Sequence, residues 1–271
     1  MTAAANPAPM TTTAEPLVLR RDAGRIAILT LNRPRAANAL SRAMIAALQD
    51  DLDRIANDPG VTVVVIEAAG KVFCAGHDLK EMRADPRPET HAELMAACSR
   101  MMSTIMRLPK PVIASVHGIA TAAGCQLVAS CDLAVATESA RFATPGVNIG
   151  LFCSTPMVAL SRAVNRKHAL EMLLTGEMIS AERAERIGLV NRVVADERLA
   201  EETLSLARSI AAKSHYTLAI GKETFQRQSE LGLDDAYALA AEVMVKNLQA
   251  VDAAEGIDAF IEKRTPVWRG C

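Results

Sequence analysis

The chain has 271 residues, half of them hydrophobic, which is enough to bury a full-sized core in one large domain or in a domain with a subdomain. Thirty basic residues balance thirty-one acidic ones, for a formal net charge of −1, and aromatic residues make up 3% of the chain. This composition argues against nucleic acid and anionic membrane as partners, because it offers neither a basic field nor many aromatic rings for base stacking.

The six cysteines are scattered, with no CxxC pair and no His–Cys cluster at metal-ligand spacing. We therefore predict reduced thiols, no metal site and a cytoplasmic protein. Residues 1–15 are rich in Ala, Thr and Pro and lack the features of a signal or transit peptide, so we predict a disordered tail. Every apolar run is shorter than a membrane-spanning helix requires.

The rest of the chain alternates strands with helices and then becomes helical. A helix capped by Ser41 separates the first two strands, and a polar stretch with two prolines, residues 83–90, is the best candidate for a mobile loop. This order favours an α/β core over residues 16–210 and a helical subdomain over residues 211–271. The predicted strands are 25–31, 61–68, 111–117, 132–137, 141–143 and 190–194, and the predicted helices include 91–108, 124–130, 199–210, 216–228, 234–248 and 253–263.

Two turns of small residues each follow a buried strand and open a helix. They are Phe73-Cys-Ala-Gly-His-Asp-Leu-Lys80 and Gly118-Ile-Ala-Thr-Ala-Ala-Gly-Cys-Gln126. The first N–H groups of a helix have no partner within it and lie at the positive end of its dipole. One turn alone is better explained as a tight strand-to-helix connection. Two facing turns would aim two N–H groups at one oxygen, as in an oxyanion hole.

These turns and the landmarks around them resemble the crotonase, or enoyl-CoA hydratase/isomerase, superfamily over residues 18–268. The further landmarks are Leu31-Asn-Arg-Pro-Arg35, Phe142-Ala-Thr-Pro145, Leu174-Thr-Gly176 and Phe260-Ile-Glu-Lys-Arg264. The resemblance implies a crotonase-type spiral of ββα units with a helical C-terminal trimerisation subdomain. It also implies an acyl-CoA thioester ligand, no cofactor beyond the coenzyme A of that substrate, and a homotrimer or a dimer of trimers.

By position, the resemblance assigns the thioester oxygen to the N–H groups of His77 and Ala123. The chain departs from the family at both hydratase glutamates, where it has Gln126 and Gly146. The amide of Gln126 does not titrate and Gly146 has no side chain, so neither can act as an acid or base, and we predict weak hydratase activity. The resemblance assigns substrate binding to Arg35, Ala37, Ala75, Gly76, His77, Asp78, Leu79, Lys80, Thr121 and Ala122, and to Phe260 and Lys263 acting on a neighbouring subunit's CoA.

Three functions stay open from the sequence. The first is weak hydration of an enoyl-CoA, in which His77 could replace the glutamates as a lone acid/base or contribute only its N–H. The second is decarboxylation of a malonyl-type acyl-CoA, which would need a stabilised enolate but no base for a carbon-bound proton. Residues 75–78 resemble methylmalonyl-CoA decarboxylases, whereas residues 152–154 differ from their tyrosine-bearing loop. The third is a non-catalytic acyl-CoA-binding regulator, so whether the protein is an enzyme is left undecided.

Overall fold

The computed structural model describes residues 15–271, so the predicted tail lies outside the described residues except for Glu15. Its main sheet has six strands in the order β1-β2-β3-β4-β6-β9. All neighbouring pairs are parallel except β1 with β2, which are antiparallel. The strands are β1 (Val18–Ala23), β2 (Ile26–Leu31), β3 (Val63–Ala68), β4 (Val112–Val116), β6 (Leu133–Thr137) and β9 (Arg192–Val194).

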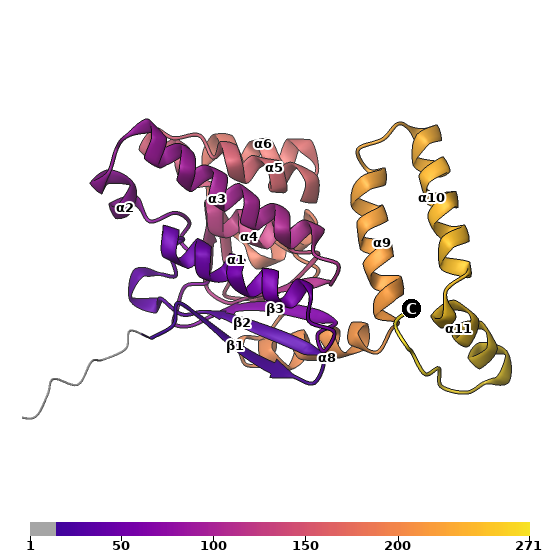
Figure 1. Cartoon of the computed structure of the whole chain (residues 1–271). Helices are drawn as coiled ribbons and strands as arrows, with labels where there is room; N and C mark the ends of the chain where they lie inside the picture. The colour runs from indigo at the N-terminus through magenta and orange to yellow at the C-terminus, as the bar shows by residue number, and fades with distance from the viewer. Residues whose placement is uncertain (1–14) are drawn as a thin grey trace, which may run out of the picture.

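Both faces of this sheet are covered, which explains why β3 and β4 are almost uniformly apolar. One face packs against α1 (Arg42–Ala56) and α3 (Pro88–Arg107). The other face packs against α8 (Leu199–Ala211), where Val63, Val65 and Ile113 meet Leu199 and Ala207. Figure 1 shows α1 and α8 on opposite sides of the strands.

A second, three-stranded sheet consists of β5 (Ile119–Thr121), β7 (Arg141–Ala143) and β8 (Ile179–Ser180). The chain runs from β4 in the main sheet to β5 in the small sheet and then into α4 (Ala123–Ser130). It repeats this path through β6, β7 and the 3₁₀ helix η2 (Pro145–Ile149) into α5 (Ser154–Ala163). These repeats are the ββα units that the sequence predicted.

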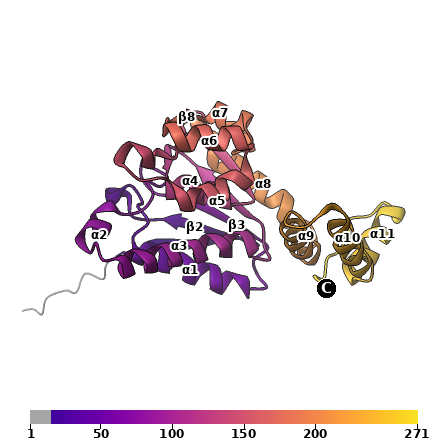
Figure 2. The ribbon, with the colours of Figure 1, turned by 90° about the horizontal axis from the view of Figure 1, so that it is seen from above.

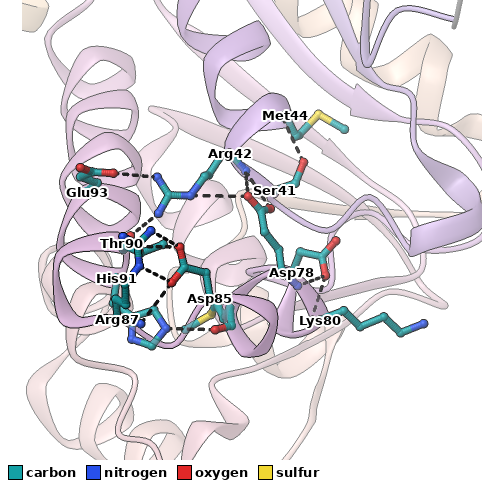
Figure 3. A network of polar contacts seen from close by, with 12 residues as sticks. Ser41, Arg42, Met44, Asp78, Lys80, Asp85, Arg87, Thr90, His91 and Glu93 are labelled. Atoms are coloured by element: carbon teal, nitrogen blue, oxygen red, sulfur yellow. Dashed lines mark hydrogen bonds and ion pairs between the residues drawn. The ribbon is translucent and has the colours of Figure 1, made fainter.

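The polar stretch predicted as a loop differs from expectation. Residues 79–107 form two helices, α2 (Leu79–Ala84) and α3, separated by a three-residue turn. Figure 3 shows the turn bound by side chains: Asp85 accepts hydrogen bonds from Arg87 at 2.8 Å and from Thr90 at 2.9 Å, and Arg42 donates to the Thr90 carbonyl. Proline is tolerated in the first turn of a helix, so Pro88 begins α3 instead of preventing it.

The C-terminal helices stand away from the core as an extended arm (Figures 1 and 2). None of the residues that the structure describes in α9 and α10 is buried. The division at residue 210 stays a prediction. The remaining helices are η1 (Pro34–Ala36), α6 (Arg166–Thr175), α7 (Ala181–Arg186), η3 (Asp196–Arg198), α9 (His215–Gln228), α10 (Leu233–Leu248) and α11 (Val251–Glu262). No helix within residues 15–271 is both long and apolar enough to cross a membrane.

Candidate functional site

The two small-residue turns lie directly against each other. The Cys74 N–H donates to the Ile119 carbonyl at 3.1 Å, and the Cys74 carbonyl accepts from the Thr121 N–H at 3.0 Å. A Cβ added to Gly124 would stand 2.1 Å from the Cys74 carbonyl oxygen, so only glycine allows this approach. The facing arrangement that the sequence suggested is therefore present.

Closer to the helix starts, the contact is equally tight. Gly76 has φ of +91°, and a Cβ added there would lie 2.9 Å from Ala122 Cβ and 3.2 Å from Ala123 N. Gly76 precedes His77, so the His77 and Ala123 N–H groups belong to neighbouring stretches of backbone.

Backbone pairing with Leu40 makes the His77 N–H point away from Leu40. The Leu40 N–H donates to the Gly76 carbonyl at 2.7 Å, and the Asp78 N–H donates to the Leu40 carbonyl at 3.4 Å. In such a parallel pairing the residue in between, His77, points its own N–H to the other side. Within residues 15–271 this N–H has no hydrogen-bond acceptor.

The residue before Ala123 has a strained backbone. Ala122 has φ of 50° and ψ of −118°, a conformation that costs an L-residue on the order of 1–3 kcal/mol and that concentrates at functional sites. Hydrogen bonds hold it there, because its N–H donates to the Ala143 carbonyl at 2.9 Å and its carbonyl accepts from the Gln126 N–H at 3.0 Å. Ala123 begins α4, and its N–H also lacks an acceptor in the described part of the protein.

Three polar side-chain atoms, two from the turns and one from the residue after β7, are buried without a hydrogen-bond partner in the described chain: His77 Nε2, Gln126 Oε1 and Thr144 Oγ1. Gln126 is 4% exposed and Thr144 is fully buried. Burial lowers the pKa of His77, so its imidazole is neutral at pH 7. Buried polar groups are normally paired, so the partnerless atoms of the turns favour a ligand site there.

Thr144 was missed by the sequence analysis, although it lies inside the Phe142-Ala-Thr-Pro145 landmark. Nothing about threonine in that motif indicates that its hydroxyl is buried alone. That property arises because Ala143 pairs with Thr121 and draws the following residue in beside the second turn.

Gly146 has no space for a side chain. An added Cβ would lie 2.6 Å from the Leu151 carbonyl oxygen and 2.9 Å from Cys153 Sγ. The turn is closed by the Leu151 N–H, which donates to the Gly146 carbonyl at 2.9 Å. Burial raises the pKa of the Cys153 thiol, so this group is protonated at pH 7.

Asp78 has a structural task at the start of α2. It caps α2 by accepting from the N–H groups of Lys80 at 3.1 Å and Glu81 at 3.2 Å, and it pairs with Arg33 at 2.7 Å. The Arg33 hydrogen bond is the main reason that the pKa of Asp78 lies below its ordinary value. An ionised, fully engaged carboxylate is a poor base at this site.

Asn38 supports the first turn and received no role from the sequence. It is buried with φ of 50°, and its side chain accepts from the Arg33 N–H and donates to the Ala69 and Val72 carbonyls, each at 2.8 Å. Next to it, the Ala37 carbonyl accepts from the Ala75 N–H at 3.0 Å. These bonds fix the backbone that leads into His77.

Among the residues predicted to bind substrate, the structure gathers those of the two turns and leaves the C-terminal ones apart. Phe260 is 85% exposed at the end of α11, and α11 lies across the molecule from α2 in both views (Figures 1 and 2). Exposed residues beside the turns are Arg35, Ala75, Leu79 and Lys80, and half-buried ones are Ala37, Thr121 and Ala122.

Comparison with known proteins shows what this fold and site belong to. The model of the enoyl-CoA hydratase/isomerase family matches residues 21–271, and the chain belongs to this family. Its fold is the predicted crotonase fold, because it aligns with the crystal structure of an enoyl-CoA hydratase from Mycobacterium smegmatis at 56% identity and a TM-score of 0.92, covering 94% of this chain and 99% of that one.

A more particular likeness is to enoyl-CoA hydratase domain-containing protein 3. The Xenopus laevis protein is 53% identical over 253 residues, which is 93% of this chain and 86% of that one. The human crystal structure shares 50% identity at a TM-score of 0.91, over 93% of this chain and all of that one. The sequences of residues 120–132, 142–148 and 150–155 resemble this same group, and the comparison confirms that resemblance.

The prediction of a cytoplasmic location is wrong by the same comparison. Relatives 48–53% identical to this chain, from frog, rat, mouse, human and zebrafish, are named as mitochondrial proteins. The prediction depended on unpaired cysteines, and thiols remain reduced in more than one compartment.

Proposed function

We propose that the chain binds an acyl-CoA thioester and that the N–H groups of His77 and Ala123 hold its carbonyl oxygen. The supporting observation is that both N–H groups lack acceptors in the described chain and lie on touching turns. A thioester enolate concentrates negative charge on that oxygen. Fixed donors stabilise the charge without reorganising as it develops.

Hydration of an enoyl thioester is expected to be slow. It needs groups that activate water and deliver protons, and the two positions that supply carboxylates in the family have Gln126 and Gly146. The neutral His77 imidazole is the one titratable candidate that remains. We infer an enolate-stabilising acyl-CoA site with weak hydratase activity.

Ala123 allows a direct test, because proline is tolerated at the first position of a helix and lacks an N–H. We expect Ala123→Pro to weaken binding of butyryl-CoA and to abolish residual crotonyl-CoA hydration, while Ala123→Gly, which keeps the N–H, does not. Because Ala123 is fully buried, the melting temperature of each variant is measured to separate a loss of binding from a loss of fold. A bound thioester oxygen more than about 4 Å from both nitrogens would contradict the assignment.

Wild-type hydration decides the second half of the proposal. We expect crotonyl-CoA turnover well below the roughly 10 s⁻¹ of an ordinary enzyme. His77→Ala should reduce what remains if the imidazole takes part, and His117→Ala is the matched control. His117 Nε2 donates a hydrogen bond to the carbonyl of Gly70, which is not a residue of the proposed site, at 2.8 Å. Turnover near the ordinary range would overturn the inference from the missing carboxylates.

We also propose that the chain assembles as a homotrimer, or as a dimer of trimers, through its helical arm. The arm exposes large apolar side chains, among them Phe225, Tyr237 and Phe260, which a monomer would leave in water. A cleft of about 960 Å³ separates α9 from α4 and α5 and offers space for a neighbour. Phe260 and Lys263 would then meet the CoA of an adjacent subunit. Light scattering that shows a monomer at micromolar concentration would refute this assembly.

A further inference from the structure

The second turn belongs to a segment of chain whose two ends are bonded to each other. The segment runs from Val112 through β4, β5 and α4 to Asp132, and Ala123 lies within it. At its ends the Val112 N–H donates to Asp132 Oδ2 at 2.7 Å, and the Asp132 N–H donates to the Val112 carbonyl at 2.9 Å. These two bonds fix the base of the segment that carries the Ala123 N–H.

Lys222 of the arm completes this junction. Its Nζ donates to Asp132 Oδ2 at 2.6 Å, to the Ile105 carbonyl at 2.9 Å and to the Lys110 carbonyl at 3.0 Å. A lysine ammonium has three N–H donors, so all of them are used here. The Lys222 side chain is 8% exposed. One buried cation from α9 therefore holds the last turn of α3, the residues before β4 and the residue that follows Cys131 after α4.

The helix between this junction and the turn is well placed to carry a displacement from one end to the other. Every residue of α4 except Ala129 is buried. Near its end the Ser130 hydroxyl donates back to the Gln126 carbonyl at 2.8 Å. Closely packed interiors have low compressibility and transmit strain. A shift at Asp132 should therefore reach the first residue of the helix, Ala123.

We propose that Lys222 is a positioning residue for the thioester site. By holding the two ends of the 112–132 segment together, it keeps the Ala123 N–H aligned with the thioester oxygen. This inference rests on the proposed acyl-CoA binding. Hydrogen bonds weaken steeply when their distance and angle depart from the optimum, so a small shift of α4 weakens this one. The arm thereby acts on the site of its own subunit, in addition to its proposed part in assembly.

The carbonyl stretch of bound [1-¹³C]butyryl-CoA reports this hydrogen bond. Hydrogen bonds to the thioester oxygen lower the stretching frequency, and isotope-edited infrared spectroscopy resolves the labelled band. We expect wild type to bind the ester with a lower frequency than the free ester has. Lys222→Met should move the band back toward the free-ester frequency and weaken binding by about 3- to 10-fold, the effect of one neutral hydrogen bond.

Lys110→Met is the matched control. Lys110 is also a buried lysine, and its Nζ donates to the Ile55 and Asp58 carbonyls, at the end of α1 and just beyond it. Its side chain makes no hydrogen bond to the 112–132 segment in the part of the chain that the structure describes. This variant should lose stability and leave the infrared band where it is in wild type. A band displaced as far as in Lys222→Met would show that the band follows stability alone, and would overturn the inference.

A double variant separates positioning from the cost of an unpaired charge. Lys222→Met leaves the Asp132 carboxylate without its cation, whereas Lys222→Met with Asp132→Asn leaves no charge, and the asparagine oxygen can still accept from the Val112 N–H. We expect the double variant to recover melting temperature but to keep the displaced band, because the bonds to the Ile105 and Lys110 carbonyls are still missing. Recovery of the wild-type band would assign the effect to the unpaired charge and refute the inference.

The remaining outcomes separate this inference from the proposed function. A lowered band in wild type that Lys222→Met leaves unchanged would refute the positioning role and leave the thioester site intact. A wild-type band at the free-ester frequency, or no binding of butyryl-CoA, would overturn the proposed function together with the inference.

Discussion

Gly146 offers the sharpest test of why this chain should hydrate enoyl thioesters poorly. A real Cβ essentially never approaches another atom within 3.0 Å, and one at position 146 would stand 2.6 Å from the Leu151 carbonyl oxygen and 2.9 Å from Cys153 Sγ. Relief requires the 151–153 segment to move, which breaks the hydrogen bond from the Leu151 N–H to the Gly146 carbonyl. Overpacking costs about 1–3 kcal/mol and the lost bond about 1 kcal/mol, so Gly146→Ala should destabilise by about 2–4 kcal/mol.

Denaturant unfolding measures this cost, and two further variants locate it. Gly221→Ala is the control with the opposite sign, because a Cβ there meets nothing within 4 Å and a helical alanine adds about 0.5–1 kcal/mol. Cys153→Ala combined with Gly146→Ala should recover part of the loss, since it removes the sulfur and leaves the Leu151 carbonyl in place.

The same packing around Gly146 predicts how added carboxylates change crotonyl-CoA hydration. Gln126 occupies a buried position that already holds a polar side chain, so Gln126→Glu should fold and raise crotonyl-CoA hydration by about 10²-fold, the lower end for one general acid–base group. Adding Gly146→Glu should lose that gain together with the fold of the 151–153 segment. A double variant as stable as wild type, with turnover near roughly 10 s⁻¹, would refute the argument that the space for a second carboxylate is closed.

Three further predictions concern single residues. Asn38→Ala should cost about 3 kcal/mol in denaturant unfolding, because it removes three side-chain hydrogen bonds at a buried residue, and a loss under about 1 kcal/mol would contradict this. Burial lowers the pKa of His77 below its ordinary 6.5, so the unfolded chain binds more protons as the pH falls below 6.5. The stability that neutral His77 provides should then be lost on acidification, and His77→Asn should flatten that part of the stability–pH curve. Lys222→Met should cost about 3 kcal/mol, because it leaves the largely buried carboxylate of Asp132, paired with Lys222 at 2.6 Å, without its cation; an unchanged melting temperature would show that the pair is dispensable.

Much of the fold was predictable, because long segments with a regular hydrophobic period can be recognised in the sequence. The strand at 61–68 and the helix beginning after Ser41 are found as β3 and α1, and the Ser41 hydroxyl accepts from the Met44 N–H as a capping residue should. The three-residue strand β5 was not predicted. It lies inside a run of small residues, and only its pairing with β7 distinguishes it from a turn.

The site was predictable only in part. Its backbone contacts could be predicted from the sequence, whereas the surroundings of its side chains could not. The glycines and alanines of the two turns mark places where backbone must approach backbone, and such places are visible in a sequence. The isolation of Thr144 and the closed space at Gly146 depend on which carbonyls and sulfur atoms pack against them. Those contacts come from residues 143 and 151–153, whose positions no local pattern specifies.

This difference explains why the family name leaves the reaction open. The donors proposed for the thioester oxygen are main-chain atoms, held by contacts such as Gly124 against the Cys74 carbonyl that almost any substitution would break. Substitutions that break those contacts would therefore damage the fold itself. The acid and base of a hydratase are side chains, and at the positions that the resemblance assigns to them this chain has Gln126 and Gly146, while the turns remain intact. Under the proposed function, enolate stabilisation is thus tied to the architecture, whereas the fate of the enolate depends on a few replaceable side chains.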